Sequence, residues 1–237
     1  MRLSIIIPVF NERETIAQIL DQVRKVKLTV ETNAGAISLE KEIIVVDDGS
    51  TDDTQAVLAD EAQAGDLVLL RHPRNRGKGA GVRTGIERST GDIVMIQDAD
   101  LEYDPRDYPA LLRPILEHRV KVVYGSRFLG PRKAMLFWHM LGNKLLTLVT
   151  NLLYNAILSD METCYKVLDG ELARSLNLKS EGWGIDPEIT AKVLKRGHRI
   201  FEVPISYYGR EYHEGKKISW RDGITVLWML LKYRVVD

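Results

Sequence analysis

Residues 93–102 read Ile-Val-Met-Ile-Gln-Asp-Ala-Asp-Leu-Glu. The four apolar residues at the start predict a buried β-strand over Ile93–Ile96. Three acidic residues then follow closely, at Asp98, Asp100 and Glu102. Carboxylates at the end of a buried strand are unfavourable unless a positive charge compensates them, and a hard cation such as Mg²⁺ or Mn²⁺ takes oxygen ligands. We therefore expect a divalent cation at this strand end and, with it, a phosphorylated substrate.

The first half of the chain alternates apolar strands with helices. Strands are predicted over Leu3–Val9, Ile43–Val46, Leu67–Leu70, Ile93–Ile96 and Lys121–Tyr124, and helices over Glu12–Val26, Thr51–Ala64, Gly77–Ser89 and Tyr108–His118. This alternation indicates βαβ units, hence an α/β fold with a mostly parallel sheet flanked by helices. The carboxyl ends of parallel strands share one edge of the sheet, where ligands bind.

Four polar clusters fall at predicted strand ends. They are Pro8-Val9-Phe10-Asn11-Glu12, Asp47-Asp48-Gly49-Ser50, Asp98-Ala99-Asp100 and Gly125-Ser126-Arg127. Each alone is explained by a helix cap or a turn. Because all four belong to one edge of one sheet, we interpret them together as a binding site.

The second half is more apolar. Lys144 is the only charged residue in Ala134–Leu158, yet polar residues recur at every fourth position, at His139, Asn143, Thr147, Asn151 and Asn155. Two interpretations stay open: core helices with a polar edge, or helices lying in a membrane surface whose polar stripe lines a site. Further on, a loop and helix are predicted over Gly182–Arg196 and a strand over Arg199–Tyr208. The last apolar run, Ile224–Leu231, is either a closing helix or a surface-binding tail.

Composition excludes several classes of protein. Lys and Arg total 33, as do Asp and Glu, so nothing indicates attraction to nucleic acid. With one cysteine, Cys164, an intrachain disulfide is impossible and a reducing compartment is expected. The N-terminus lacks the pattern of a signal peptide. No uninterrupted apolar stretch is long enough for a membrane-spanning helix.

The combined motifs resemble the inverting family-two glycosyltransferases of GT-A fold. The similarity lies in Pro8–Glu12, Val45–Ser50, Asn75–Gly79, Asp98–Asp100, Gly125–Phe128, Asp160–Lys166 and Val203–Arg210. Within that family the chain resembles the group of dolichol-phosphate mannose synthases and polyprenyl-phosphate glycosyltransferases. The resemblance implies one catalytic domain over residues 1–237, with a nucleotide-sugar-binding half (1–130) and an acceptor-side half (131–237) carrying amphipathic helices at a membrane surface.

The resemblance also implies roles for particular residues. Pro8, Phe10, Glu12, Val45 and Asp47 would hold the nucleoside of a nucleotide-sugar. Asp98, Ala99 and Asp100 would engage the diphosphate and an Mg²⁺ or Mn²⁺ ion, with Glu102 as a third ligand. Arg127, Arg210 and Lys216 would contact phosphates, so that Asp100, Arg127, Arg210 and Lys216 form the expected catalytic set.

The implied reaction moves mannose from GDP-mannose, or glucose from UDP-glucose, to a polyprenyl or dolichyl phosphate. Such a phosphate is largely ionised near neutral pH, because its second pKa is about 6, and needs no strong general base. We expect direct displacement with inversion, with the acceptor phosphate held by Arg127, Arg132 or Lys133. The expected location is cytoplasmic, peripheral at the inner face of the membrane.

Three alternatives remain. The acceptor could be a soluble sugar or a polysaccharide, or the chain could be an inactive sugar-nucleotide-binding protein. A nicotinamide-dependent dehydrogenase is disfavoured because Gly77-Lys78-Gly79-Ala80-Gly81 lacks the dinucleotide-binding context. The stretch His213-Glu214-Gly215-Lys216-Lys217 departs from the Gly-Glu-Ser-Lys usual in mannose synthases, which leaves the donor sugar open.

Overall fold

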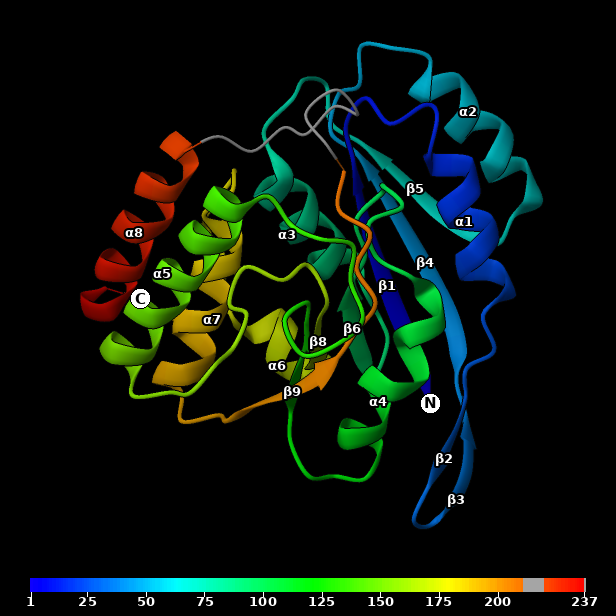
Figure 1. Cartoon of the computed structure of the whole chain (residues 1–237). Helices are drawn as coiled ribbons and strands as arrows, with labels where there is room; N and C mark the ends of the chain where they lie inside the picture. Colours follow the sequence, from blue (N-terminus) through cyan, green and yellow to red (C-terminus); the bar gives the residue numbers. More distant parts are fainter. Residues whose placement is uncertain (211–219, 237) are drawn as a thin grey trace.

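A computed structural model describes residues 1–210 and 220–236, with side chains at 1–210 and 223–236 (Figure 1). The strands are β1 Arg2–Val9, β2 Thr29–Thr32, β3 Gly35–Ser38, β4 Glu40–Asp47, β5 Leu67–Arg71, β6 Ile93–Ile96, β7 Val122–Ser126, β8 Lys166–Asp169 and β9 Ile200–Pro204. The helices are α1 Ile16–Lys25, α2 Thr54–Glu61, α3 Lys78–Arg88, α4 Tyr108–Leu116, α5 Phe137–Tyr154, α6 Gly170–Ser175, α7 Ile185–Lys195 and α8 Trp220–Val235. Short 3₁₀ turns, η1 and η2, cover Ala62–Ala64 and Pro105–Asp107.

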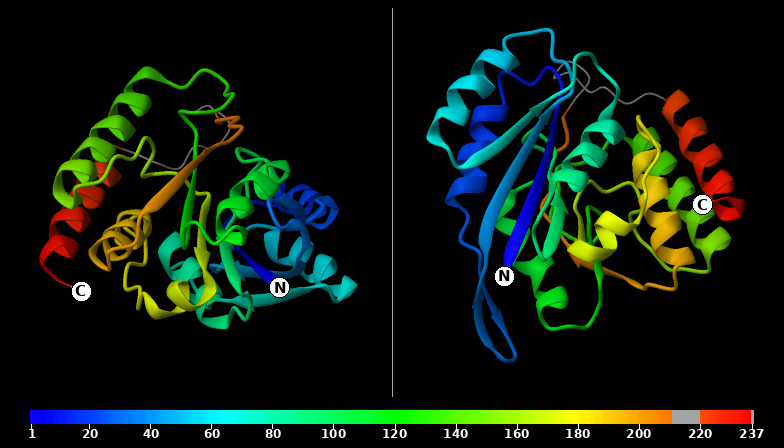
Figure 2. Two further views of the ribbon diagram at one scale, coloured as in Figure 1. Left: turned by 90° about the horizontal axis from the view of Figure 1, so that it is seen from below. Right: turned by 180° about the vertical axis from the view of Figure 1, so that it is seen from behind.

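A seven-stranded sheet in the order β5-β4-β1-β6-β8-β7-β9 forms the centre of the molecule. Neighbouring strands are parallel except at β8, which is antiparallel to both β6 and β7. The predicted α/β fold with a mostly parallel sheet is confirmed. Helices α1 and α2 lie at one end of the molecule, and α5, α7 and α8 form the opposite flank (Figures 1 and 2).

The centre of the sheet is buried because its central strands are mostly apolar. Ile5, Ile6 and Ile7 of β1 are inaccessible to solvent, as are Ile44, Val45 and Val46 of β4. Continuous apolar runs of this kind are typical of parallel strands covered on both faces. The predicted polar clusters therefore lie where the buried strands β1, β4, β6 and β7 end, at the upper edge in Figure 1.

Several elements were not predicted, among them the short helix α6. Residues 29–38 form the antiparallel hairpin β2–β3, which projects from the opposite edge of the molecule (Figure 1). The short strand β8 enters the sheet between β6 and β7, so the fourth and fifth predicted strands are not neighbours. The predicted strand over Arg199–Tyr208 is shorter than expected, since β9 ends at Pro204.

Helix α5 has an unusual orientation. Its polar positions face the protein, with Thr147 and Thr150 buried, whereas its apolar side is exposed to solvent. The interpretation of Ala134–Leu158 as core helices with a polar edge is therefore wrong. The polar stripe instead holds the following loop: Thr147 accepts a hydrogen bond from the Met161 amide, and Asn151 pairs with both backbone groups of Leu158.

Helices α5 and α8 pack together, and each presents a row of apolar side chains to solvent; we call these two rows the apolar face. It consists of Phe137, Trp138, Leu141, Leu145, Leu148 and Leu152 of α5 and Ile224, Trp228, Leu231 and Val235 of α8. Trp138 is 77% exposed, Leu152 75% and Trp228 62%. On the other side of α8, Val226 and Leu230 are buried against α5. Among the described residues, no helix has both the length and the apolar character needed to cross a membrane.

Candidate active site

The turns after β1 and β4 are tied together. The Asn11 amide donates to Ser50 Oγ at 3.0 Å, and Asn11 Oδ1 accepts from the Thr51 amide at 2.8 Å. Asn11 has φ 53°, a left-handed conformation that asparagine tolerates better than most residues. The Glu12 amide donates to Thr54 Oγ1 at 3.0 Å. These bonds hold the two predicted nucleoside-binding clusters side by side.

Asp47 is completely buried at the end of β4. Its Oδ1 accepts the Ser50 amide at 3.0 Å, while its Oδ2 has no hydrogen-bond partner among the described residues. A buried carboxylate oxygen without a donor is unfavourable until a ligand supplies one. Of the other predicted nucleoside-binding residues, Val45 is buried within the sheet, and Pro8 and Phe10 are half-buried at the same edge.

Asp48 has a structural role that the sequence did not reveal. Its carboxylate accepts the amides of Arg76 and Gly77, and His72 Nδ1 lies 2.6 Å from Oδ1. These contacts fix the loop that leads into α3. Gly77 has φ 99°, and a Cβ there would come within 2.5 Å of the Glu181 carbonyl oxygen. The glycines at the start of α3 thus allow close packing against residues 180–182.

Lys78 begins α3 and pairs with the first acidic residue of the 98–102 stretch. Its Nζ lies 2.6 Å from Asp98 Oδ1 and 5.6 Å from the centre of the Trp183 ring. Burial opposes ionisation of Asp98, but the charge of Lys78 lowers the pKa of this carboxyl. Lys78 lies in the motif Asn75–Gly79, but the sequence pattern alone does not assign it to the site.

Asp100 and Glu102 meet Arg210 instead. Asp100 Oδ2 lies 2.7 Å from Arg210 Nη2, and Glu102 accepts the Arg210 amide at 2.7 Å and the Tyr207 hydroxyl at 2.8 Å. Burial, with the charges of Asp98 and Glu102, raises the pKa of Asp100 to about 7. Asp100 and Glu102 thus both contact Arg210.

This edge of the sheet carries a surplus of negative charge, which favours binding of a divalent cation. Asp98, Asp100, Glu102 and Glu12 provide four carboxylates, against the two cations Lys78 and Arg210. Hard oxygen donors of this type suit Mg²⁺ or Mn²⁺. Within the described chain, however, no three acidic, histidine or cysteine residues already converge as a set of metal ligands. Lys78 and Arg210 pair with Asp98 and Asp100, the carboxylates that would bind such a metal.

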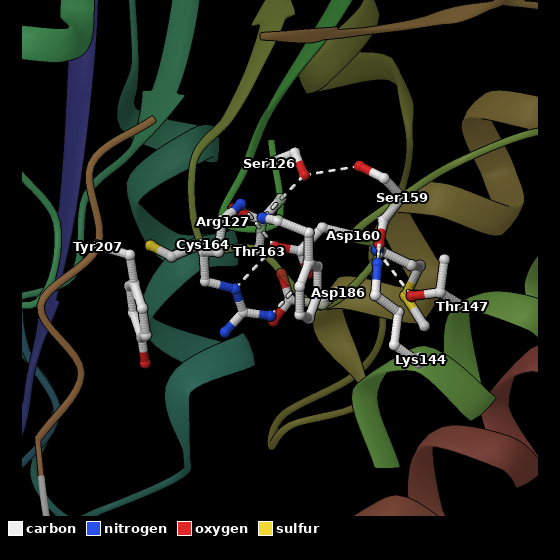
Figure 3. Close-up of polar contacts among 12 residues, drawn as sticks. Ser126, Arg127, Lys144, Thr147, Ser159, Asp160, Thr163, Cys164, Asp186 and Tyr207 are labelled. Carbon is white, nitrogen blue, oxygen red and sulfur yellow. Dashed lines mark hydrogen bonds and ion pairs between the residues drawn. The ribbon is translucent and has the colours of Figure 1, made fainter. Parts of the chain in front are cut away.

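Arg127, directly after β7, is paired with Asp160 (Figure 3). The backbone amide and Nε of Arg127 donate to Oδ2 at 2.9 and 2.7 Å, and Nη2 donates to Oδ1 at 2.7 Å. Asp160 is fully buried and Arg127 nearly so. The Arg127 guanidinium also lies 5.4 Å from the Tyr207 ring. Arg127 is thus at the predicted edge, and Asp160 holds two of its five guanidinium N–H groups.

A second group of cations surrounds Phe128, beside Arg127. Lys144 Nζ lies 3.6 Å from the ring centre and donates to the Ser159 carbonyl at 3.1 Å. The Arg132 guanidinium lies 5.8 Å from the same ring and donates to the Phe128 carbonyl. Lys144 belongs to α5, so this group joins the sheet edge to the apolar face. Lys216, the remaining predicted catalytic residue, lies outside the described residues.

Glu162, a half-buried acidic residue of the motif Asp160–Lys166, also has an unusual environment. Glu162 lies in the loop before β8, and its Oε1 has no hydrogen-bond partner in the described part of the chain. Burial, together with the nearby charge of Asp186, raises the pKa of Glu162 to about 8. Asp186 itself is paired with the buried Lys166 at 2.6 Å.

Comparison with known proteins agrees with this architecture. Residues 4–174 match the family described as Glycosyl transferase family 2. The chain is 30% identical over 229 residues to an undecaprenyl-phosphate mannosyltransferase of Micrococcus luteus, covering 91% of this chain and 87% of that protein. It is 29% identical over 208 residues to the glycosyltransferase AglJ of Haloferax volcanii, covering 87% of this chain and 63% of AglJ.

Solved structures show the same fold. Glucosyl-3-phosphoglycerate synthase of Mycobacterium tuberculosis, in a complex with Mn²⁺, UDP and glucosyl-3-phosphoglycerate, superposes with a TM-score of 0.71 at 20% identity. The match covers 100% of this chain and 81% of that one. The chain therefore belongs to glycosyl transferase family 2, has the GT-A fold and is a glycosyltransferase.

Proposed function

We propose that this glycosyltransferase moves a hexose from a nucleoside-diphosphate sugar to the phosphate of a polyprenyl lipid at a membrane surface. The donor is GDP-mannose or UDP-glucose. The observation that carries the proposal is the apolar face of α5 and α8, which adjoins the site through Lys144. An enzyme with a freely soluble acceptor has no need for such a surface.

The donor half of the proposal is supported by the edge formed by β1, β4 and β6. Asp47 offers an unsatisfied buried acceptor for an N–H or O–H group of a nucleoside. Asp100, with Asp98, would hold the divalent cation, for which the surplus negative charge is suited. A protein of the same fold binds UDP and Mn²⁺ together.

The acceptor half is supported by the position of the apolar face. Two exposed tryptophans, Trp138 and Trp228, lie on it among leucines and isoleucine. Tryptophan and leucine on one side of a helix are typical of segments that lie in the membrane interface. The relative from Micrococcus luteus is named for an undecaprenyl-phosphate acceptor. We infer that this face rests on the bilayer that contains the lipid phosphate.

The cations around Phe128 would receive the acceptor phosphate. Arg132 is exposed, and Lys144 is held over the Phe128 ring with spare donor capacity. Arginine forms bidentate contacts with phosphate, and lysine contributes a point charge. The bonds between Arg127 and Asp160 would mainly fix the chain after β7, next to the cations around Phe128.

The reaction then needs positioning and charge stabilisation more than proton transfer. The phosphate oxygen is already ionised, so its attack on the anomeric carbon requires no strong base. The bond to the diphosphate breaks as the new bond forms, with inversion at that carbon. The divalent cation, when bound, neutralises the departing diphosphate. Arg210, and Lys216 as the sequence predicts, would add positive charge on the same side.

The test offers each donor to different acceptors. Purified protein with Mg²⁺ or Mn²⁺ would receive GDP-mannose or UDP-glucose together with a short polyprenyl phosphate, 3-phosphoglycerate or a soluble sugar. We expect transfer to the polyprenyl phosphate alone, and from one donor in preference. Transfer to a soluble acceptor, with none to the lipid phosphate, would overturn the lipid-phosphate assignment. Absence of transfer and of donor hydrolysis would favour an inactive sugar-nucleotide-binding protein.

A further inference from the structure

Arg210 lies between three carboxylates that come from separate segments. Its Nη1 is 3.3 Å from Glu12 Oε2, its Nη2 is 2.7 Å from Asp100 Oδ2, and its Nε is 3.7 Å from Glu102 Oε1. Glu12 follows β1, whereas Asp100 and Glu102 follow β6. The guanidinium therefore lies where these three acidic side chains converge.

The hydrogen bonding of Arg210 is incomplete. Its contact with Asp100 is short, but those with Glu12 are 3.3–3.4 Å long and spread over both carboxylate oxygens. Nε is buried and has no hydrogen-bond partner among the described residues. A well-formed arginine–carboxylate pair has two short, parallel bonds. The side chain is thus held more by the surplus negative charge than by specific geometry.

The backbone of Arg210, by contrast, is fixed. Glu102 accepts the Arg210 amide at 2.7 Å and the Tyr207 hydroxyl at 2.8 Å, and its carbonyl accepts the Tyr208 amide at 2.9 Å. The side chain can therefore leave Asp100 while its Cα stays in place. Glu102 has both carboxylate oxygens committed to this segment, so it serves as an anchor for residues 207–210.

We propose that Arg210 is an exchangeable counter-cation: it neutralises Asp100 and Glu12 in the empty enzyme, is displaced by the divalent cation, and then binds the donor diphosphate. The proposal rests on the proposed function, because it needs a metal–diphosphate donor. It assigns Asp100 to the metal and gives Glu102 the separate task of anchoring residues 207–210. Arg210 then competes with the metal before the nucleotide arrives and cooperates with it afterwards.

The test measures Mn²⁺ binding to the full chain in the absence of acceptor. Isothermal titration with and without UDP or GDP would compare the wild type with Arg210→Gln, which removes the charge, and Arg210→Lys, which keeps it. In nucleotide-free protein we expect Arg210→Gln to bind Mn²⁺ about tenfold more tightly than wild type, since a competing cation is lost. With Mn²⁺ present, the same variant should bind the nucleoside diphosphate about tenfold more weakly, since a phosphate contact is lost.

Arg106→Gln is the matched control. Arg106 is an exposed arginine near the same edge that pairs with Asp104, so its loss should leave Mn²⁺ affinity unchanged. Arg210→Lys should stay within about threefold of wild type for both ligands, which keeps the test valid if the glutamine variant fails to fold. The exchange would be overturned if nucleotide-free Arg210→Gln bound Mn²⁺ no more tightly than wild type. It would also be overturned if Arg210→Lys bound Mn²⁺ about tenfold more tightly than wild type, as expected for Arg210→Gln.

The two proposals fail in different ways. If the wild type binds Mn²⁺ and a nucleoside diphosphate but Arg210→Gln does not tighten Mn²⁺ binding, only the role of Arg210 is wrong. If the wild type binds neither Mn²⁺ nor a nucleoside diphosphate, the donor site of the proposed function fails, and the exchange fails with it. The outcome does not depend on which acceptor is used.

Discussion

Arg127 and Arg210 lie at the same edge of the sheet, yet they are held in opposite ways. Arg127 makes two side-chain bonds of 2.7 Å to a single buried partner, Asp160. Arg210 is divided among three carboxylates and leaves Nε without a hydrogen-bond partner in the described chain. The comparison shows that a basic residue expected to bind phosphate can be part of the scaffold or can be available for exchange. Sequence motifs do not separate these two cases.

The largest expected effect comes from removing the carboxylate that Arg210 shares with the proposed metal. Asp100→Ala should reduce glycosyl transfer by about 10³-fold, since it removes a charged group that would act directly on the leaving diphosphate. Steady-state transfer at saturating Mn²⁺ measures this. Asp104→Asn, which alters an acidic residue bonded to Arg106 instead, is the control and should retain activity. Full activity in Asp100→Ala would contradict the proposed donor site.

Stability measurements distinguish a structural arginine from an exchangeable one. Asp160→Ala leaves the buried Arg127 charge without its partner and should lower the free energy of unfolding by about 3–5 kcal/mol. Arg210→Gln should lower it by less, because the Arg210 side chain is more exposed than that of Arg127 and its contacts with Glu12 are long. Urea denaturation of both variants provides the measurement. Equal losses would mean that Arg127 and Arg210 are equally structural.

A smaller effect is expected on membrane binding. Trp138→Glu with Leu152→Glu places two charges on the apolar face and should reduce binding to vesicles by at least about tenfold, since each large apolar side chain contributes about 1.5–3 kcal/mol when buried. Co-sedimentation with vesicles of phosphatidylcholine and phosphatidylglycerol measures this. Ala36→Glu adds a charge at an exposed position of the β2–β3 hairpin and should leave binding unchanged. Undiminished binding by the double variant would show that the apolar face is not the docking surface.

The smallest effect concerns the pH dependence of stability. Burial and Asp186 raise the pKa of Glu162 to about 8, above its ordinary value, so the stability it contributes is present at low pH and is lost as the pH rises towards 8. Glu162→Gln cannot ionise. We expect its stability to fall less than that of the wild type between pH 5 and 8. Parallel curves of unfolding free energy against pH would contradict this origin of the shift.

Much of this architecture could be predicted from local patterns. Apolar runs located β1, β4, β5, β6 and β7, and the rule for parallel strands brought their polar ends to one edge. The strand β8 was not predicted because Lys166–Asp169 is only four residues long and starts with a lysine. In the structure this lysine is buried and bonded to Asp186 and backbone carbonyls. Short strands of this kind carry little periodicity.

The interior contacts of the site could not be predicted. Asp160 lies 33 residues from Arg127 in the sequence, and Glu12 lies 198 residues from Arg210. The sequence placed the basic residues at the correct edge, but which of them a carboxylate neutralises depends on tertiary packing. The side of α5 that faces the protein could not be predicted for a related reason. A helix with one polar stripe and an otherwise apolar surface can pack on either side. In this protein the polar stripe faces inward because it binds the neighbouring loop 158–161.

The antiparallel insertion of β8 has a consequence for the order in which the chain folds. β7 pairs with β8 and β9 and makes no ladder with β6. During synthesis, β1, β4, β5 and β6 can therefore assemble as an early unit, whereas β7 must wait until about 40 further residues, including α5, have emerged. Loop closure of that length slows the joining step. Until then α5 would be exposed on a nascent chain that could meet a membrane before its sheet is complete.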